Sequence, residues 1–118
     1  MIAELATVKR PPVAVAVLRL ARELESHGIT ADPHEGDGVA ALSVACWLVV
    51  WCHDHPAGLC FRWWTGRVSL NTGRWIYALC PADNPTTAAR RIAARFRELR
   101  ALEEAEVQLE EHRSPWPI

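Results

Sequence analysis

Residues 13–24 show a hydrophobic pattern that is typical of helices. Apolar residues recur at intervals of three and four, which places them on one face of a helix; they are Val13, Val17, Leu20 and Leu24. Pro12 stands where a proline suits the first helical turn. Gly28 suits the residue after the helix end, and Ile29 provides the apolar contact that often accompanies it. We therefore expect a helix over residues 13–27.

The middle of the chain holds short apolar runs rich in β-branched and aromatic residues. Five of the six tryptophans lie here. Val39–His53 contains neither glycine nor proline, so it is either one long bulged strand or two strands with a break near Ala45-Cys46. Turn residues then predict a turn at residues 53–58 and a second turn at residues 66–73. A strand is predicted after each turn, over residues 59–65 and 74–80. This pattern predicts an antiparallel meander of three or four strands.

Residues 30–38 separate the first helix from these strands. They include Asp32-Pro33, Gly36 and Asp37-Gly38, which predict a loop. Its carboxylates and His34 are residue types that bind divalent cations, but their spacing matches no known ligand loop. A solvated acidic loop is therefore the favoured interpretation.

The last third of the chain predicts a second, longer helix. Asp83 or Asn84 suits its N-cap and Pro85 its first turn. Its buried stripe is predicted to be Ala88, Ile92, Phe96, Leu99 and Leu102, weakly extended by Ala105 and Leu109. Residues 1–10 are expected to be a loose lead-in and residues 114–118 a tail, so that residues 1–118 form one domain. The order of elements predicts an α+β fold with both helices packed on one face of the sheet.

Alternation along the strands predicts which side chains lie beneath the helices. Successive residues of a strand point to opposite faces, and the core face is assigned Leu48, Val50, Cys52, Phe61, Trp63, Ile76, Ala78 and Cys80. Arg62 decides the assignment in its strand, because an unpaired guanidinium beneath helices is costly. The opposite, open face is then predicted to carry Trp47, Trp51, Arg62, Trp64, Trp75 and Tyr77.

An aromatic patch of this kind favours aggregation in a monomer, so we expect it to be covered. A second copy related by twofold symmetry is one possible cover, and a partner protein is another, since Trp, Tyr and Arg are enriched at binding hot spots. A small aromatic or anionic ligand held by Arg62 is a third. In a fourth interpretation, the chain's own last helix or tail covers the rings as ordinary core. A self-interface or protein interface is the favoured hypothesis.

Composition narrows the classes of function. The chain of 118 residues is half hydrophobic and has a formal net charge of −1, which argues against a dedicated nucleic-acid or membrane-surface protein. No apolar segment of a signal peptide accompanies Lys9-Arg10, and Val39–Cys52 is shorter than the about 20 residues of a membrane-spanning helix. We therefore expect a cytoplasmic protein with reduced cysteines, and no membrane partner.

The cysteines and histidines suggest two kinds of chemistry. Cys52-His53-Asp54-His55 with Cys60 is a zinc hypothesis, but structural zinc sites usually have pairs of closely spaced cysteines, which are absent here. Cys46, Cys52, Cys60 and Cys80 lie in apolar runs, where a free cysteine behaves as a small hydrophobic residue. Cys52 with His55 as base is a catalytic hypothesis that lacks a recognisable oxyanion element or orienting acid. We predict no metal, no cofactor and no enzymatic activity.

The last helix has an unusual order of charges. Its first half carries Arg90, Arg91, Arg95, Arg97 and Arg100, and its second half carries Glu103, Glu104, Glu106, Glu110 and Glu111. Both halves oppose the helix macrodipole, which favours acids first and bases last. Arg90, Arg91 and Arg95 are therefore candidates for binding an anion at the helix start. Alternatively, two such helices pair antiparallel, basic half to acidic half, or the charges form a solvated face.

Two resemblances concern most of the chain. The order of helix, three strands and helix, with Thr86–Arg91 opening the last helix, is similar to the double-stranded-RNA-binding domain, but the lysine-rich helix start of that family is absent. Segments 49–52, 61–66 and 81–91 resemble small uncharacterised proteins of high-GC Gram-positive bacteria. Neither resemblance implies an activity for this chain.

We predict a non-enzymatic protein that forms a homodimer, or binds another protein, through the aromatic face or the last helix. The alternative is a nucleic-acid- or anion-binding module that uses the arginines at the start of that helix.

Overall fold

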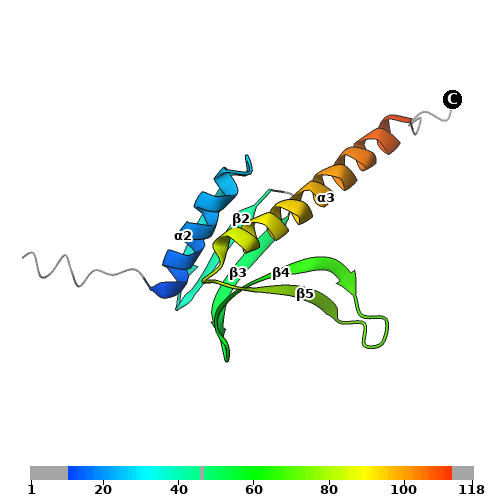
Figure 1. Cartoon of the computed structure of the whole chain (residues 1–118). Helices are drawn as coiled ribbons and strands as arrows, with labels where there is room; N and C mark the ends of the chain where they lie inside the picture. The colour runs from blue at the N-terminus through cyan, green and yellow to red at the C-terminus, as the bar shows by residue number, and fades with distance from the viewer. Residues whose placement is uncertain (1–10, 46, 113–118) are drawn as a thin grey trace, which may run out of the picture.

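The computed structural model describes residues 11–45 and 47–112, with side chains up to residue 110. Within these residues the chain forms an α+β fold, as predicted, with both helices on one face of an antiparallel sheet (Figure 1). The sheet has five strands in sequence order, where three or four were predicted. The elements are α2 (Pro12–Glu25), β1 (Ala31–Gly36), β2 (Val39–Val44), β3 (Leu48–His55), β4 (Gly58–Val68), β5 (Trp75–Pro81) and α3 (Pro85–His112).

The helix α2 confirms the predicted amphipathic stripe and its ending. All four stripe residues are buried: Val13, Val17, Leu20 and Leu24. The backbone turns at Gly28, whose φ of 75° lies in the region that favours glycine. The N–H of Ile29 then donates to the carbonyl of Leu24 at 3.0 Å, and Ile29 is buried. This closing turn directs the chain back toward the sheet.

The prediction of a loop at residues 30–38 is wrong, because most of this segment forms the edge strand β1. It pairs with β2, and Pro33 lies opposite Leu42. A proline has no N–H for the ladder, but an edge strand has a free side that tolerates this. Asp37 and Gly38 form the two-residue turn with φ values of 51° and 78°. Asp-Gly favours this hairpin geometry, so these residues connect two strands.

The segment between Val39 and His53 forms two strands, β2 and β3, joined at residues 45–47. Trp47 has a φ of 64°, a conformation that residues other than glycine rarely adopt. Cys46 lies outside the described residues. The turn therefore uses a residue without the usual turn preference, which is why the sequence left one strand and two strands open.

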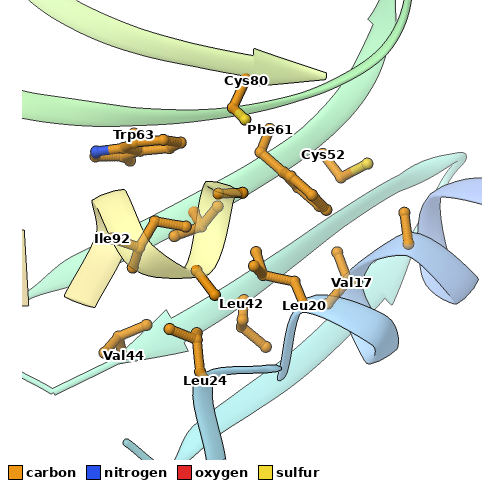
Figure 2. Close-up of a cluster of buried hydrophobic side chains, with 14 of the residues drawn as sticks. Val17, Leu20, Leu24, Leu42, Val44, Cys52, Phe61, Trp63, Cys80 and Ile92 are labelled. Carbon is orange, nitrogen blue, oxygen red and sulfur yellow. The ribbon is translucent and has the colours of Figure 1, made fainter. Parts of the chain in front are cut away.

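The core lies between the two helices and the inner face of the sheet (Figure 2). Its largest fully buried side chains include Phe61 from the sheet, Leu20 from α2 and Ile92 from α3. The predicted alternation is confirmed for Leu48, Val50, Cys52, Phe61, Trp63 and Cys80, which are all buried. Burying a large apolar side chain stabilises a fold by about 1.5–3 kcal/mol. This inner face therefore anchors the strands beneath the helices.

The outer end of the β4–β5 hairpin leaves the rest of the sheet. β3 pairs with β4 from His55–Gly58 to Trp51–Arg62, and β4 then continues with β5 as its neighbour. Figure 1 shows this hairpin bending away from α3. Ile76, which was predicted to be core, is 41% exposed. The alternation is correct there, because Ile76 lies on the side of α3, but a cavity lined by both separates it from the helix.

The helix α3 packs on the sheet with its first half alone. The carboxamide of Asn84 caps it, accepting from the N–H of Thr87 at 3.3 Å. Ile92 is fully buried, whereas Leu102, predicted to be buried, is 59% exposed. The second half of the helix projects past the sheet (Figure 1). Its described residues there are exposed, including Ala105 and Leu109 of the predicted extension.

Candidate functional site

The six residues predicted for the open face are here called the aromatic surface: Trp47, Trp51, Arg62, Trp64, Trp75 and Tyr77. They come from the turn before β3 and from β3, β4 and β5. Trp47 is fully exposed and Trp75 is 57% exposed. Trp51, Tyr77 and Arg62 are also exposed, and Trp64 is half-buried. The open face thus carries large rings that the described part of the chain leaves accessible to solvent.

Ring contacts hold part of this surface in a fixed arrangement. The guanidinium of Arg62 lies 4.2 Å from the centre of the Tyr77 ring, a cation–π contact. Trp64 and Trp75 stack with their ring centres 4.3 Å apart and an angle of 23° between them. The indole N–H of Trp64 also donates to the carbonyl of Arg67 at 3.1 Å. The hairpin therefore presents its rings as a preformed surface.

The sheet opens where β3 and β4 separate, and the aromatic surface lines this opening. We call it the notch, a cavity of about 210 Å³. Five of its lining residues belong to the aromatic surface: Trp47, Trp51, Trp64, Trp75 and Tyr77. Leu48 and Val49 line it from β3, and Arg95 and Leu99 from α3. Within the described residues, the last helix thus reaches the rim without covering the exposed rings, and the predicted tail lies outside those residues.

A second cavity, here called the arginine groove, lies between α3 and the β4–β5 hairpin. Its volume is about 430 Å³, and it is lined by Trp63, Thr65, Arg67, Ile76, Ala78, Arg91, Ala94, Arg95 and Glu98. Three arginines face one glutamate along its walls, so the lining has an excess of positive charge. Arg91 donates to the carbonyl of Leu79 at 3.0 Å and lies 5.1 Å from the centre of the Trp63 ring.

Arg95 belongs to both the notch and the arginine groove. Its side chain is 13% exposed, and its Nη1 lies 3.8 Å from Oε1 of the largely exposed Glu98. Such a long, solvated ion pair contributes little. The Nε of Arg95 is buried and has no hydrogen-bond partner within the described residues. The positive charge of Arg95 is therefore poorly balanced, and a buried charge without a good partner is costly.

The predicted anion-binding set is only partly brought together. Arg91 and Arg95 line the arginine groove, but Arg90 is not among its lining residues. The Nη2 of Arg90 donates to Oγ1 of Thr87 at 3.5 Å. Arg67 lines the groove in place of Arg90, because β4 extends beyond the predicted strand end at Thr65. The sequence offered no signal for Arg67, which was assigned to a turn.

The cysteine and histidine cluster is divided between the two faces of the sheet. Cys52 pairs with Phe61 on the core side, whereas His53 pairs with Cys60 on the other. Burial raises the pKa of Cys52 to about 11, with smaller contributions from Cys60 and Asp54. A thiol with this pKa is a poor nucleophile at neutral pH, because the thiolate is the reactive form. The geometry therefore gives no support to Cys52 as a nucleophile.

Within the described residues, the structure brings together no set of metal ligands for the zinc hypothesis or for the cation hypothesis at residues 30–38. Among the residues that the structure describes, no group of three or more His, Cys, Asp or Glu side chains could hold a metal ion. The acidic residues of segment 30–38 lie exposed along β1 and its turn. The predicted solvated acidic loop is therefore exposed to solvent, but it is a strand and a turn and not a loop.

The comparisons with known proteins leave the function to be argued from geometry. No family model matches the chain, and no curated protein or solved structure matches it either. In the part of the chain that the structure describes, no helix combines the length and the apolar character needed to cross a bilayer. The aromatic surface, the notch and the arginine groove are therefore the features from which a function is inferred.

Proposed function

We propose that this protein is a non-enzymatic assembly protein that forms a homodimer by burying its aromatic surface. The proposal rests on the exposure and the backbone conformation of Trp47. It is fully exposed and has a φ of 64°. A left-handed backbone costs a residue other than glycine about 1–2 kcal/mol, and an exposed indole gains nothing from the core. A residue with two such disadvantages is expected where it serves binding.

The neighbouring residues support a protein partner over a small ligand. Tryptophan, tyrosine and arginine are the side chains most enriched at binding hot spots, and all six residues of the aromatic surface are of these types. Leu79 adds an exposed apolar side chain beside them. The notch has a volume of only about 210 Å³, so a ligand that fits it would cover part of each ring and leave the rest exposed. A protein surface would cover both.

The charges of α3 favour a second copy of the chain as that protein. The first half of the helix is basic and the second half acidic, and the second half projects beyond the sheet (Figure 1). Two antiparallel copies would bring unlike halves together. A twofold dimer also covers one surface with an identical surface, which is the commonest oligomeric arrangement of soluble proteins.

The experiment compares the mass of the wild-type protein with that of Trp47→Ser and Trp75→Ser by light scattering over a range of concentrations. We expect the wild type to be a dimer and each variant to dissociate at roughly tenfold higher concentration or more, which corresponds to about 1.4 kcal/mol. Leu70→Ser is the matched control, because Leu70 is fully exposed at the hairpin tip. A wild type that stays monomeric at the highest concentration contradicts the proposal.

A second candidate function is the binding of phosphate groups of a nucleic acid or another anion. The observation that favours it is the convergence of Arg67, Arg91 and Arg95 in one groove. Binding of labelled RNA or DNA across a salt series tests this candidate, which requires an affinity that falls as salt rises. Binding that is insensitive to salt, or absent, removes it.

A further inference from the structure

We infer that α3 pairs with α3 of a second copy in one defined antiparallel register, in which the acidic end of each helix enters the arginine groove of the other copy. This inference rests on the proposed homodimer and assigns the surface and the register of its contact. It begins with a stripe of six residues along the helix: Arg91, Arg95, Leu99, Leu102, Glu106 and Glu110.

The spacing of the stripe places its six residues on one side of the helix. Successive members are four, four, three, four and four residues apart. Steps of three or four residues correspond to about one helical turn of 3.6 residues, so neighbours along the stripe lie above one another. The stripe therefore runs lengthwise along α3 as a single continuous surface.

The stripe is also symmetric with reversed charge. Its mirror point lies between Arg100 and Ala101, so Arg91 corresponds to Glu110 and Arg95 to Glu106. The two leucines correspond to each other across the same point. In a twofold contact, if a residue of one copy meets a second residue of its partner, the reverse contact is made as well. Antiparallel pairing about this point therefore joins each arginine to a glutamate and places the leucines at the centre.

The first three residues of the stripe, Arg91, Arg95 and Leu99, form its inner half and border the two cavities. Arg91 and Arg95 line the arginine groove, and Leu99 lines the notch together with Arg95. Arg67 adds positive charge from the opposite wall of the groove. A glutamate delivered between these walls meets several guanidinium groups, and carboxylates bind guanidinium through charge-assisted hydrogen bonds. The groove is therefore suited to the acidic end of a helix.

The outer half of the stripe is free to act as that occupant. Leu102 is largely exposed, and Glu106 and Glu110 are exposed too. Within the described residues neither glutamate has an ion-pair partner. Figure 1 shows this part of α3 extending away from its own sheet. It can therefore lie along the inner half of a neighbouring α3, next to that copy's groove.

The pairing also accounts for the unsatisfied charge of Arg95. Within its own copy, Arg95 has the long contact with Glu98 and a buried Nε without a hydrogen-bond partner among the described residues. A carboxylate from Glu106 of the second copy would balance this charge in the dimer. Arg95 and Leu99 also line the notch, so the contact along the stripe would border the aromatic surface there.

The test uses two charge-reversed variants, R91E/R95E and E106R/E110R. The first has an all-acidic stripe and the second an all-basic stripe, so each repels its own copy. Because twofold symmetry counts every contact twice, each variant changes four ion pairs. We expect each to dimerise roughly tenfold more weakly or worse than the wild type. Mixed in equal amounts, the two variants should form a heterodimer at least as tight as the wild-type dimer.

E106R/E110R keeps the test valid if R91E/R95E fails to fold, because both of its changes lie on the exposed outer half of α3. Single substitutions provide a matched control. E106R and E104R alter the net charge equally within the same exposed segment. Two residues turn a helix through about 200°, so Glu104 faces away from the stripe. We expect E106R to weaken the dimer and E104R to leave it nearly unchanged.

The outcomes separate this inference from the proposed function. If the wild type is a monomer, both fail. If the wild type is a dimer that Trp47→Ser weakens while E106R/E110R does not, the dimer stands and this register is wrong. If the mixed variants do not associate, the inference is overturned as well. Salt-dependent binding of labelled RNA by a monomeric wild type, lost in R91E/R95E, would instead assign the arginine groove to a nucleic acid.

Discussion

The guanidinium of Arg95 occupies the space that a side chain on Gly66 would need. The Cζ of Arg95 lies 2.8 Å from the position of a Cβ at residue 66, and a terminal nitrogen lies closer still. Gly66 also has a φ of 87° and lies in the irregular step of β4 between Trp64 and Arg67. The glycine therefore lets α3 and the hairpin approach each other, which brings Arg95 to the wall shared by the notch and the arginine groove.

We predict that Gly66→Ala destabilises the fold and moves Arg95. The positive φ alone is expected to cost about 1 kcal/mol, and displacement of the guanidinium, which is the end of a flexible side chain, should raise the total loss to about 1–2 kcal/mol. Gly73→Ala is the matched control, because Gly73 has a φ of 70° but nothing within 4 Å of its Cβ position. Urea unfolding of both variants measures the difference. Equal losses at the two positions would show that the contact with Arg95 does not matter.

The turn before β3 leads to a prediction in which stability and binding change in opposite directions. Replacing Trp47 by glycine removes the left-handed strain, so we expect the free energy of unfolding to rise by about 1 kcal/mol. Loss of the ring should weaken self-association at the same time. Trp47→Ala is the control: it also loses the ring but keeps the strain, so it should associate weakly without a gain in stability. Thermal unfolding and light scattering measure the two effects, and an unstrained site would give both variants the same stability.

The parts of the fold that could be predicted depend on local patterns. The stripe of α2 and the alternation from Leu48 to Cys52 arise because one face of each element is buried, and burial selects apolar residues at the period of that element. The position of Arg62 followed from the cost of burying its charge. These arguments were sufficient to assign the fold class and to place the aromatic surface on the open face.

The parts that could not be predicted depend on where elements end in space. Alternation put Ile76 on the inner face, but no sequence pattern states that the hairpin and α3 diverge there and leave a groove between them. The same holds for Leu102, which has helical spacing but lies beyond the sheet. Asp37-Gly38 was a hairpin signal, yet Pro33 made its first strand resemble a loop. Arg67 joined the arginine groove because β4 runs on through Gly66 and pairs there with β5, a tertiary pairing that the turn residues of this segment did not indicate.

The stack of Trp64 and Trp75 should hold the outer end of the hairpin in place. The arginine groove separates most of this region from α3, which approaches it closely at Gly66 through Arg95, so few other contacts restrain it. We predict that Trp75→Ala lowers the free energy of unfolding by about 1 kcal/mol, the scale of an aromatic pair together with partial burial. Amide hydrogen exchange should accelerate in residues 64–76 and remain unchanged in β2. Leu70→Ala, at the exposed hairpin tip, is the control and should leave exchange as it is. Faster exchange throughout the sheet would argue against a local role.

The raised pKa of the buried Cys52 thiol leads to a prediction of how stability depends on pH in the alkaline range. Burial raises its pKa from 9.0 to about 11, so the thiol of the unfolded chain ionises at lower pH than that of the folded chain. The folded state then binds more protons, and stability must fall as pH rises. The contribution of Cys52 is fully present below pH 9.0 and is lost as pH passes about 11, with a slope of at most about 1.4 kcal/mol per pH unit.

Urea unfolding at several pH values from 8 to about 11 measures this slope. Cys52→Ala is the appropriate comparison, because it removes the titrating thiol while every other ionisable group remains. The variant is expected to be less stable at every pH, since truncation leaves space in the core. Its stability should nevertheless fall less steeply above pH 9 than that of the wild type. Parallel curves for the two proteins would show that Cys52 ionises alike in the folded and unfolded states, which contradicts its burial beside Phe61.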